Sequence, residues 1–467
     1  MTTEVRADPG SFRDPSGGVI HANGSVFRYF RGSDAAEFAR LTESDFFRSS
    51  VDSHLLIATT PVERAKSPEL YAFAKGAELV VEHPKLPFVS YPYEWPFEML
   101  KAAAECQMEV IRSAFDNGYL VKDATPYNVQ FLGCEPTFVD VASIEPYKKG
   151  ATWAGYTQFC QTFLNPLLLQ SITGVPFQPW LRSNLDGIEP DHLRALLPWR
   201  SKFRKAVFLD VVLQSWLGRK FADDTKSMKA ISKREAPKEV VSALLKRMEK
   251  QVSGLKRRKV KTTWSDYEDT KDHYSATADS YKEAFVRSML TKYSARTVWD
   301  LGANRGQFSL IASEMADQVV AIDFDEAAVG ALFERLRGKV KNVLPLVIDF
   351  LNPSPAQGWG GVERQSLTAR SQADSFLCLA LIHHLSISGN VPFSLIASWL
   401  ASIAPSGIVE FVPKDDPMVK RLLLTKKDVY PNYTQEHFEA CLKEHFAINE
   451  RASIPESKRV LYWLGPR

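Results

Sequence analysis

The sequence predicts an α/β fold for residues 262–467, with a mainly parallel sheet and flanking helices. Short apolar runs alternate there with amphipathic stretches, as in TVWDLGA, QVVAIDF, VLPLVIDF and GIVEFV. Such alternation is typical of a parallel sheet wrapped by helices. A glycine-bearing turn directly follows the first of these runs. Residues 1–218 mix strand-like and helical patterns less regularly, which predicts a separate α+β domain.

Composition sets the broad class of protein. The chain has 467 residues, 45% of them hydrophobic, and a net charge of +3. This length suggests two or three domains, and the charge is too small to indicate a nucleic-acid partner. The first residues lack an apolar signal segment, and no run approaches the roughly 18 apolar residues of a membrane span. The five cysteines form no CxxC pair. We therefore expect a cytoplasmic protein with reduced thiols, no membrane span and no metal site.

A basic stretch separates the two halves. Residues 219–261 contain many lysines and arginines, few aromatic residues, and the run LKRRKVK near their end. A solvated helical linker is the first interpretation, and a patch facing RNA or a membrane is the alternative. The predicted domains are thus 1–218, 219–261 and 262–467.

The first half contains a clear hairpin and a long helix. Asn23 and Gly24 form a strong turn signal between two apolar runs within residues 17–30. Residues 77–118 indicate a strand, a hinge and then a helix that ends at Asn117-Gly118.

Residues 119–140 read YLVKDATPYNVQFLGCEPTFVD. Asp123 follows an apolar pair, Asn128 comes five residues later, and Asp140 follows two short apolar runs joined by a turn at Gly133. Kinase-like folds use this layout for a catalytic Asp, an Asn and a metal-binding Asp. The sequence therefore predicts a kinase-like domain, intact or degenerate, whose three side chains would converge on Mg-ATP.

Three interpretations of this loop stay open: an active kinase-like site, a degenerate site that binds a nucleotide or glycan without chemistry, and a loop tied by side-chain to backbone hydrogen bonds. Phosphoryl transfer also needs a lysine on a strand and a glycine-rich loop. The first half shows neither clearly. Lys75, Lys85 and Lys122 lack the right strand context, and Arg28 is a weak substitute.

Residues 298–325, VWDLGANRGQFSLIASEMADQVVAIDFD, form the most specific motif. A buried strand ends near Asp300, Gly302 and Gly306 bracket a tight turn, and a second strand ends at Asp323. Glycine permits positive φ and a close approach of the backbone to a ligand. An acid at the end of the second strand suits a ribose diol.

The pattern of this turn is D-x-G-x-x-x-G rather than the dinucleotide fingerprint GxGxxG. It resembles motif I of class I S-adenosylmethionine (SAM) methyltransferases, and an empty Rossmann-like domain is the alternative. The resemblance implies a Rossmann-like domain with SAM as cofactor, with Asp323 on the ribose and Asp349 of VIDF on the adenine amino group. The implied cofactor-binding residues are Asp300, Gly302, Asn304, Gly306, Asp323 and Asp349.

The sequence indicates the residues that would bind the methyl acceptor less clearly than those that would bind SAM. The sequence has no NPPY-type tetrad and no Pro-Cys pair for base methylation. His383 and His384 follow the fourth strand and are candidate bases for a hydroxyl acceptor, with packing as the alternative role. Glu410 and Lys414 either line the acceptor site or carry surface charge. The segment before the first strand often covers the cofactor in this fold, and its candidates here are Tyr267, Tyr274, Tyr281 and Lys282.

Several stretches together, including YPYEWPFEMLKAAA, LVKDATPYNVQF and EFVPKDDPMV, carry a resemblance over nearly the whole chain. They are similar to a family of bacterial class I SAM-dependent methyltransferases that includes host-specific nodulation proteins of the NoeA type. The stretch AEFARLTESDFF looks shortened relative to that family. The resemblance implies methyl transfer, which we expect on an oxygen of a small molecule or glycan. A bifunctional kinase-methyltransferase and a non-catalytic SAM-binding adaptor remain as alternatives.

Overall fold

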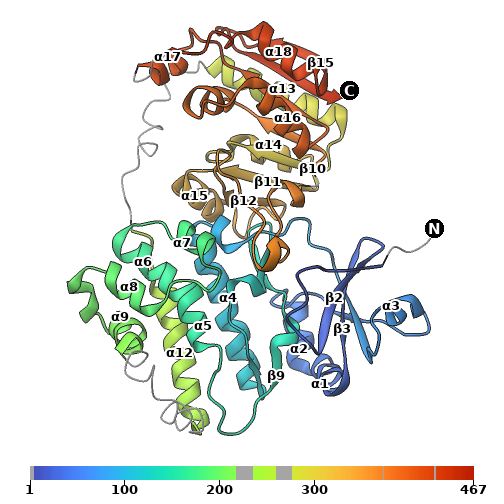
Figure 1. Cartoon of the computed structure of the whole chain (residues 1–467), viewed down its shortest axis with the longest axis vertical. Coiled ribbons are helices and arrows are strands. Elements are labelled where there is room, and N and C mark those ends of the chain that lie inside the picture. The colour runs from blue at the N-terminus through green and yellow to red at the C-terminus, as the bar shows by residue number, and fades with distance from the viewer. Residues whose placement is uncertain (1–4, 217–234, 259–275, 372, 425–427) are drawn as a thin grey trace. The chain divides into compact units, whose positions relative to one another are not determined.

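A computed structural model describes residues 5–216, 235–258, 276–371, 373–424 and 428–467 (Figure 1). The chain divides into two compact units, and each includes a short segment from the other half of the sequence. The first unit comprises Met1–Leu132, Pro136–Val260 and Gln357–Arg364, and the second comprises Gly133–Glu135, Lys261–Ala356 and Gln365–Arg467. None of the described helices combines the length and the apolar character that crossing a membrane requires.

The first unit begins with a five-stranded antiparallel sheet in the order β1-β2-β3-β5-β4. Asn23 and Gly24 connect β2 to β3 with φ angles of 51° and 80°, which confirms the predicted hairpin. The strands are β1 Arg6–Ala7, β2 Gly17–Ala22, β3 Ser25–Phe30, β4 Thr60–Pro61 and β5 Leu79–His83.

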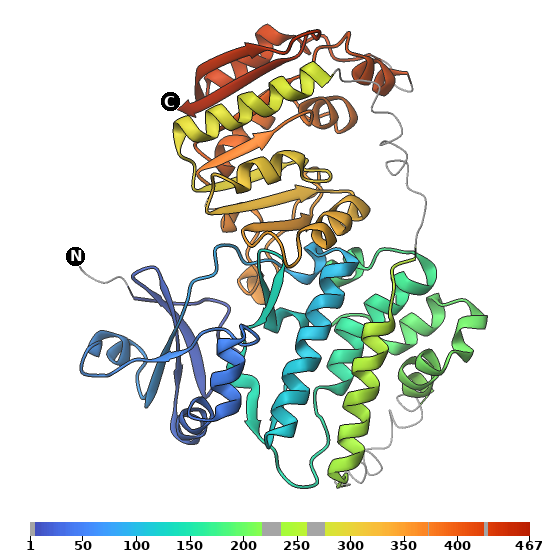
Figure 2. The same cartoon turned by 180° about the vertical axis from the view of Figure 1, so that it is seen from behind.

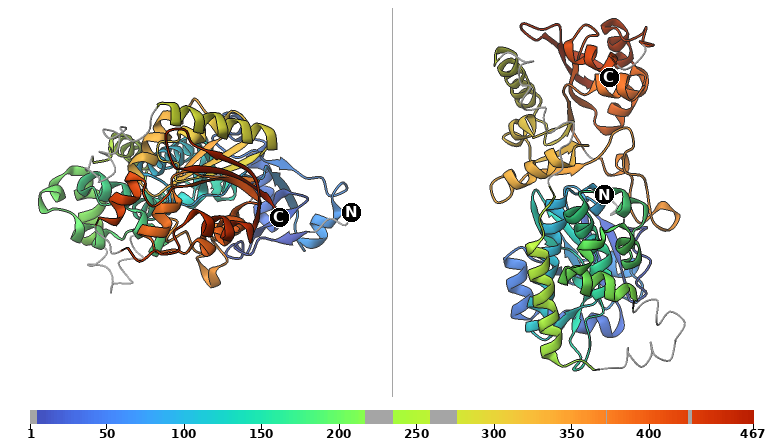
Figure 3. Two further views of the ribbon diagram at one scale, coloured as in Figure 1. Left: turned by 90° about the horizontal axis from the view of Figure 1, so that it is seen from above. Right: turned by 90° about the vertical axis from the view of Figure 1, so that its left-hand side faces the viewer.

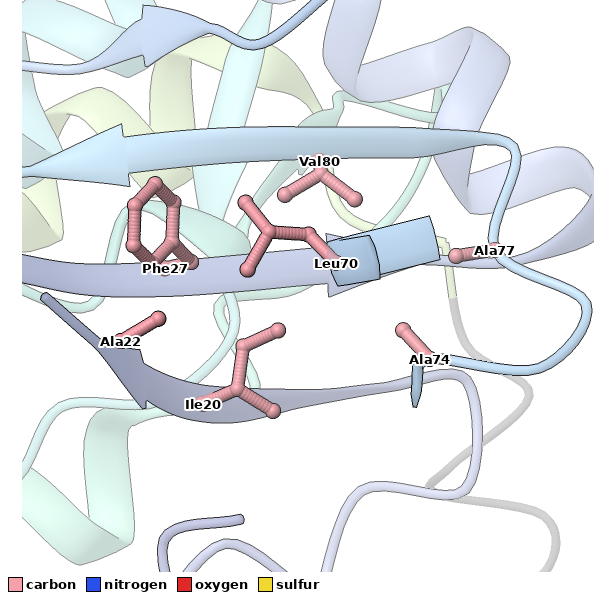
Figure 4. Packing of buried hydrophobic residues seen from close by; sticks show 7 residues of the cluster. All are labelled: Ile20, Ala22, Phe27, Leu70, Ala74, Ala77 and Val80. Atoms are coloured by element: carbon pink, nitrogen blue, oxygen red, sulfur yellow. The ribbon is translucent and has the colours of Figure 1, made fainter. Parts of the chain in front are cut away.

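Apolar side chains cover both faces of this sheet. On one face they meet helix α3 (Pro68–Phe73), as Figure 4 shows; the cluster comprises Ile20, Ala22, Phe27, Leu70, Ala74, Ala77 and Val80. Elsewhere helix α1 (Gly32–Thr42) stacks Phe38 on Phe30, with ring centroids 4.2 Å apart. Burial of these side chains is the main force that holds the small sheet to its helices.

The remainder of the first unit is mostly helical and surrounds α4 (Phe97–Asp116), which ends at Asn117 before Gly118 as predicted. Two short strand pairs follow α4, with β6 antiparallel to β9 and β7 paired with β8. The strands are β6 Tyr119–Val121, β7 Val129–Leu132, β8 Glu135–Phe138 and β9 Ile144–Pro146. The other helices are α2 Asp45–Asp52, α5 Tyr156–Phe159, α6 Asn165–Thr173, α7 Gln178–Ser183, α8 Pro190–Leu196 and α9 Lys205–Val207.

The described part of the expected basic linker is helix α12 (Lys238–Gly254), and it belongs to the first unit. Its buried residues Val241, Leu245, Met248 and Val252 recur at helical spacing. They form the stripe that packs against α4. Arg247 forms a bidentate ion pair with the fully buried Asp210, with Nη1 2.6 Å from Oδ2 and Nη2 2.7 Å from Oδ1. This helix is therefore part of a folded core, whereas residues 217–234 and 259–261 lie outside the described residues.

The second unit contains a seven-stranded sheet in the order β12-β11-β10-β13-β14-β16-β15. The first five strands in this order are parallel, and β16 runs antiparallel to both of its neighbours. The mainly parallel sheet predicted from the sequence is thus confirmed. The strands are β10 Thr297–Leu301, β11 Gln318–Asp323, β12 Val343–Val347, β13 Ser375–Cys378, β14 Ser406–Phe411, β15 Phe446–Ser453 and β16 Val460–Pro466.

Helices cover both faces of this sheet, as opposite views of the unit show (Figures 2 and 3). Helix α13 packs with α14 on one face, and α16 packs with α18 on the other. Strands covered on both faces are mostly apolar, and every residue of β11 and β13 is buried. The helices are α13 Ala276–Tyr293, α14 Gln307–Ser313, α15 Glu326–Leu336, α16 Phe393–Ile403, α17 Pro417–Leu423 and α18 Gln435–Lys443.

Candidate active site

The loop between β10 and α14 lies at the carboxyl ends of the parallel strands, where open α/β sheets bind their ligands. Gly302 takes a φ of 80°, and its amide and that of Ala303 each donate to the Ile322 carbonyl oxygen at 2.9 Å. Asn304 also has a positive φ, 48°, a conformation that asparagine tolerates better than most residues. The backbone therefore turns sharply and stays tied to the neighbouring strand β11.

Asp323 ends β11 and is oriented by backbone amides. Its Oδ2 accepts from the Asn304 amide at 2.8 Å, and its Oδ1 accepts from the Asp325 amide at 2.9 Å. Burial raises the pKa of Asp323, and these two hydrogen bonds oppose that effect. A carboxylate has about four acceptor positions. Each oxygen can therefore accept one further hydrogen bond, and this pair of oxygens matches a ribose diol.

Asp349 follows β12 and is exposed. Its Oδ1 accepts from the Leu351 amide at 2.9 Å, which orients the carboxylate. The preceding residue, Ile348, donates its amide to the Asp323 carbonyl oxygen at 2.9 Å. The structure thus brings the loops of Asp323 and Asp349 together at one edge of the sheet.

Asp300 and Gly306 support the loop from inside. The Asp300 side chain is buried and accepts from Ser309 Oγ at 2.6 Å, in the first turn of α14. Burial raises the pKa of Asp300 to about 7. A Cβ atom at Gly306 would lie 2.6 Å from Leu332 Cδ1. In the structure these two residues hold helices against the sheet, and their predicted roles at the cofactor stay predictions.

The two histidines follow β13. His383 is 2% exposed, its Nδ1 has no partner, and its ring centroid lies 4.2 Å from that of His384. Burial, and then the nearby His384 and Lys282 side chains, hold the pKa of His383 well below its usual value. His384 is half-buried, and burial lowers its pKa as well. Both rings are therefore neutral at pH 7, and His384 is the more accessible of the two.

Glu410 does not carry surface charge, which was one of the two roles expected from the sequence, and its role at the acceptor site stays a prediction. Its carboxylate is completely buried at the end of β14. One oxygen accepts from Lys282 Nζ at 2.8 Å and from the Ala380 amide at 2.9 Å, and the other lies 3.3 Å from Arg459 Nη1. The network joins α13, the β13 loop and the turn before β16.

Lys282 is buried by this network, with its Nζ also 5.3 Å from the centre of the Phe308 ring. Tyr281 lies on the same helix and is 37% exposed. The other two candidates for a cofactor cover, Tyr267 and Tyr274, lie outside the described residues. Lys414 lies after β14 and binds the Tyr430 carbonyl oxygen at 2.9 Å and Asp428 Oδ1 at 2.8 Å.

The first unit brings Asp123, Asn128 and Asp140 into one region. Asn128 Nδ2 donates to the Asp123 carbonyl oxygen at 3.4 Å, and the Asn128 carbonyl oxygen accepts from the Val139 amide at 2.8 Å. Asp140 Oδ1 accepts from Arg28 Nη1 at 2.6 Å. Sequence reasoning gave Arg28 little weight, although its position on a strand next to a hairpin was a usable signal.

Comparison with known proteins identifies the family. No family model matches the sequence. Nodulation protein NoeA from Rhizobium meliloti (strain 1021) is 39% identical over 457 residues, which are 97% of this chain and 94% of that protein. The chain belongs to the NoeA family. In this NoeA-family chain, the second unit combines a mainly parallel sheet with a glycine-bearing turn between β10 and α14.

Solved structures also resemble this NoeA-family chain. The N-methyltransferase NodS from Bradyrhizobium japonicum WM9, in complex with S-adenosylhomocysteine, is 13% identical, with a TM-score of 0.33 over 43% of this chain and 93% of that one. Magnesium protoporphyrin IX methyltransferase from Synechocystis PCC 6803, with bound SAM, is 16% identical, with a TM-score of 0.30 over 45% of this chain and 87% of that one.

Proposed function

We propose that this chain transfers a methyl group from SAM to a hydroxyl group of a small molecule or glycan. One observation carries the proposal. The loop after β10 and the carboxylates of Asp323 and Asp349 meet at the carboxyl edge of the sheet, each oriented by backbone amides. This arrangement offers fixed acceptors to a ribose and to an adenine amino group. SAM supplies a methyl group on a positively charged sulfur.

Phe324 adds a residue that the sequence reasoning missed. It lies between Asp323 and Asp325, and its side chain is 54% exposed. An exposed aromatic ring beside a ribose-binding carboxylate is suited to pack against an adenine base. We assign Phe324 this packing role.

His384 is our candidate for the base. Methyl transfer to a hydroxyl forms an O–CH₃ bond and breaks the S–CH₃ bond, and the hydroxyl proton must leave. A neutral imidazole at pH 7 can take that proton, and His384 is neutral and partly accessible. Most of the acceleration would come from holding donor and acceptor in line, because proximity supplies the larger share of such rate enhancements.

The experiment is S-adenosylhomocysteine formation from SAM, with fractionated extract as the pool of acceptors. Production that requires extract supports the proposal, and purification of the methylated product then identifies the acceptor. His384→Gln should lower the rate by about 100-fold or more while SAM affinity stays unchanged. SAM binding without turnover in any fraction would instead favour the adaptor alternative. An unchanged rate in His384→Gln would remove this residue as the base.

We also infer a kinase-like architecture for the first unit. The small antiparallel sheet is followed by α4, by the loop that holds Asp123 and Asn128, and by the β7–β8 hairpin that leads to Asp140. This order of elements is the one that the kinase-like interpretation requires. It supports the prediction made from the spacing of the three residues.

A further inference from the structure

An ion pair in the first unit joins residues that are far apart in the sequence. Arg28 lies on β3, and its Nη1 is 2.6 Å from Asp140 Oδ1, beyond the end of β8. Both side chains are largely buried, with exposed fractions of 20% and 24%. In kinase-like sites the strand cation binds phosphates and the Asp after the hairpin binds Mg²⁺. Here the two groups bind each other.

The neighbouring loop adds oxygen-bearing groups to the pair. The hydrogen bond from the Val139 amide to the Asn128 carbonyl oxygen, 2.8 Å, holds Asn128 beside the segment that carries Asp140. Asn128 Nδ2 also donates to the Asp123 carbonyl oxygen at 3.4 Å, so Asp123 belongs to the same loop.

Two buried polar atoms at this place have no partner. His83, the last residue of β5, is 6% exposed, and its Nε2 makes no hydrogen bond. Its Nδ1 lies 3.1 Å from the Ala58 carbonyl oxygen, which only accepts, so the proton is on Nδ1 and Nε2 is an unused acceptor. Arg28 Nε is an unused buried donor. His83 pairs with Val26 of β3, two residues before Arg28, so the His83 and Arg28 side chains project from the same face of the sheet.

Unpaired buried donors and acceptors are rare in folded proteins, because each costs about 1–3 kcal/mol. A ligand that brings both an acceptor and a donor would satisfy Arg28 and His83 together. A phosphate chain offers acceptors to a guanidinium group, and a nucleobase with an amino group offers a donor. A bound Mg²⁺ would take over the carboxylate of Asp140, which releases Arg28 to the phosphates.

We propose that the first unit binds a nucleoside triphosphate as its Mg²⁺ complex, with Arg28 on the phosphates and Asp140 and Asn128 on the metal. Mg²⁺ at such sites takes only one or two protein ligands and completes its shell with phosphate oxygens and water. Among the described residues no group of three His, Cys, Asp or Glu side chains is placed to hold a metal ion by itself. The nucleotide is thus part of the metal site. This inference does not depend on the proposed methyltransferase function.

The test is calorimetric titration of the full chain with ATP, with and without Mg²⁺, and with Mg²⁺-tripolyphosphate as a ligand without a nucleoside. We expect saturable binding of ATP only with Mg²⁺, and binding of tripolyphosphate at least tenfold weaker. Arg28→Met and Asp140→Asn should each weaken Mg-ATP at least tenfold, whereas Arg28→Lys should stay within a few-fold of wild type.

The matched control is Asp8→Asn. It removes the carboxylate that pairs with His21 of β2 at 2.8 Å, directly after the end of β1. Its Mg-ATP affinity should equal that of wild type. SAM titration of every sample separates this proposal from the proposed function, because SAM binds the second unit. A flat Mg-ATP titration of wild type beside normal SAM binding would overturn the inference. So would equal Mg-ATP affinities in wild type and in a folded Arg28→Met variant.

Discussion

The Lys282 ammonium lies 2.8 Å from the Glu410 carboxylate, and these side chains are only 4% and 0% exposed. Removing charges from water is costly, and the cost is recovered only when the partners are close and all of their hydrogen bonds are made. Glu410 meets this condition through Lys282, the Ala380 amide and Arg459. The same carboxylate thereby fixes the loop that leads to the two histidines.

Loss of Lys282 should destabilise the second unit strongly. Lys282→Met leaves Glu410 short of a buried partner, and we expect the free energy of unfolding to fall by about 3 kcal/mol. Thermal and urea unfolding of wild type and variant measure this change in the free energy of unfolding. The control is Lys292→Met on the same helix, whose pair with Glu450 is exposed; this change should leave the melting temperature nearly unaltered. Equal effects of the two substitutions would show that the buried pair contributes little.

The exposed carboxylate of Asp349 provides a test of the cofactor site that spares the fold. Asp349→Ala should weaken SAM binding about tenfold, since a hydrogen bond to a charged group is worth about 1.5–3 kcal/mol. Calorimetry with SAM measures the change. Asp317→Asn is the matched control, because Asp317 lies before β11, at the opposite end of the strands from Asp349. A loss of affinity in the control but not in Asp349→Ala would refute the assigned site.

Gly306 tests packing beneath the cofactor loop. An added methyl group would meet Leu332 of α15 at 2.6 Å, on a backbone with a φ of 76°. Gly306→Ala should therefore lower the free energy of unfolding by about 1–3 kcal/mol. Gly338→Ala isolates the backbone contribution, because Gly338 has a φ of 73° and no atom within 4 Å of the added Cβ. Similar losses in both variants would mean that contact with Leu332 is unimportant.

Asp300 should make the stability of the second unit depend on pH. Its folded pKa of about 7 lies above the unfolded value of about 3.9. The folded state therefore binds more protons between these values, and this contribution to stability is full below pH 4 and is lost as pH rises through 7. Asp300→Asn, which keeps an acceptor for Ser309, should remove the dependence. Melting temperatures of both proteins from pH 5 to 8 measure it, and parallel curves would contradict the assignment.

The sheet of the second unit was predictable because its signals are local. The buried strands are mostly apolar, and the turn needs glycine at Gly302, so both features are visible in a short window of sequence. The hairpin at Asn23-Gly24 and the end of α4 at Asn117 were predictable for the same reason.

The sequence could not show which charged residues form ion pairs when they lie more than 100 residues apart in the chain. Glu410 lies in the apolar run GIVEFV, where a charge signals burial, but its partner Lys282 is 128 residues away. Arg28 and Asp140 are separated by 112 residues. The packing of helix α12 could have been predicted, because the helical spacing of its apolar residues is visible in the sequence: Val241, Leu245, Met248 and Val252. The density of basic residues around that stripe favoured a solvated linker over a packed helix.

The long separations within the Glu410 network also affect how the protein is made. A ribosome releases the chain from its N-terminal end, and Lys282 emerges well before Glu410, which itself precedes Arg459 by 49 residues. The Lys282 ammonium therefore lacks its partner, the Glu410 carboxylate, while the first strands of the sheet emerge. The second unit can close its interior only after its last hairpin has been synthesised, so a nascent chain that pauses before Arg459 should be a substrate for chaperones.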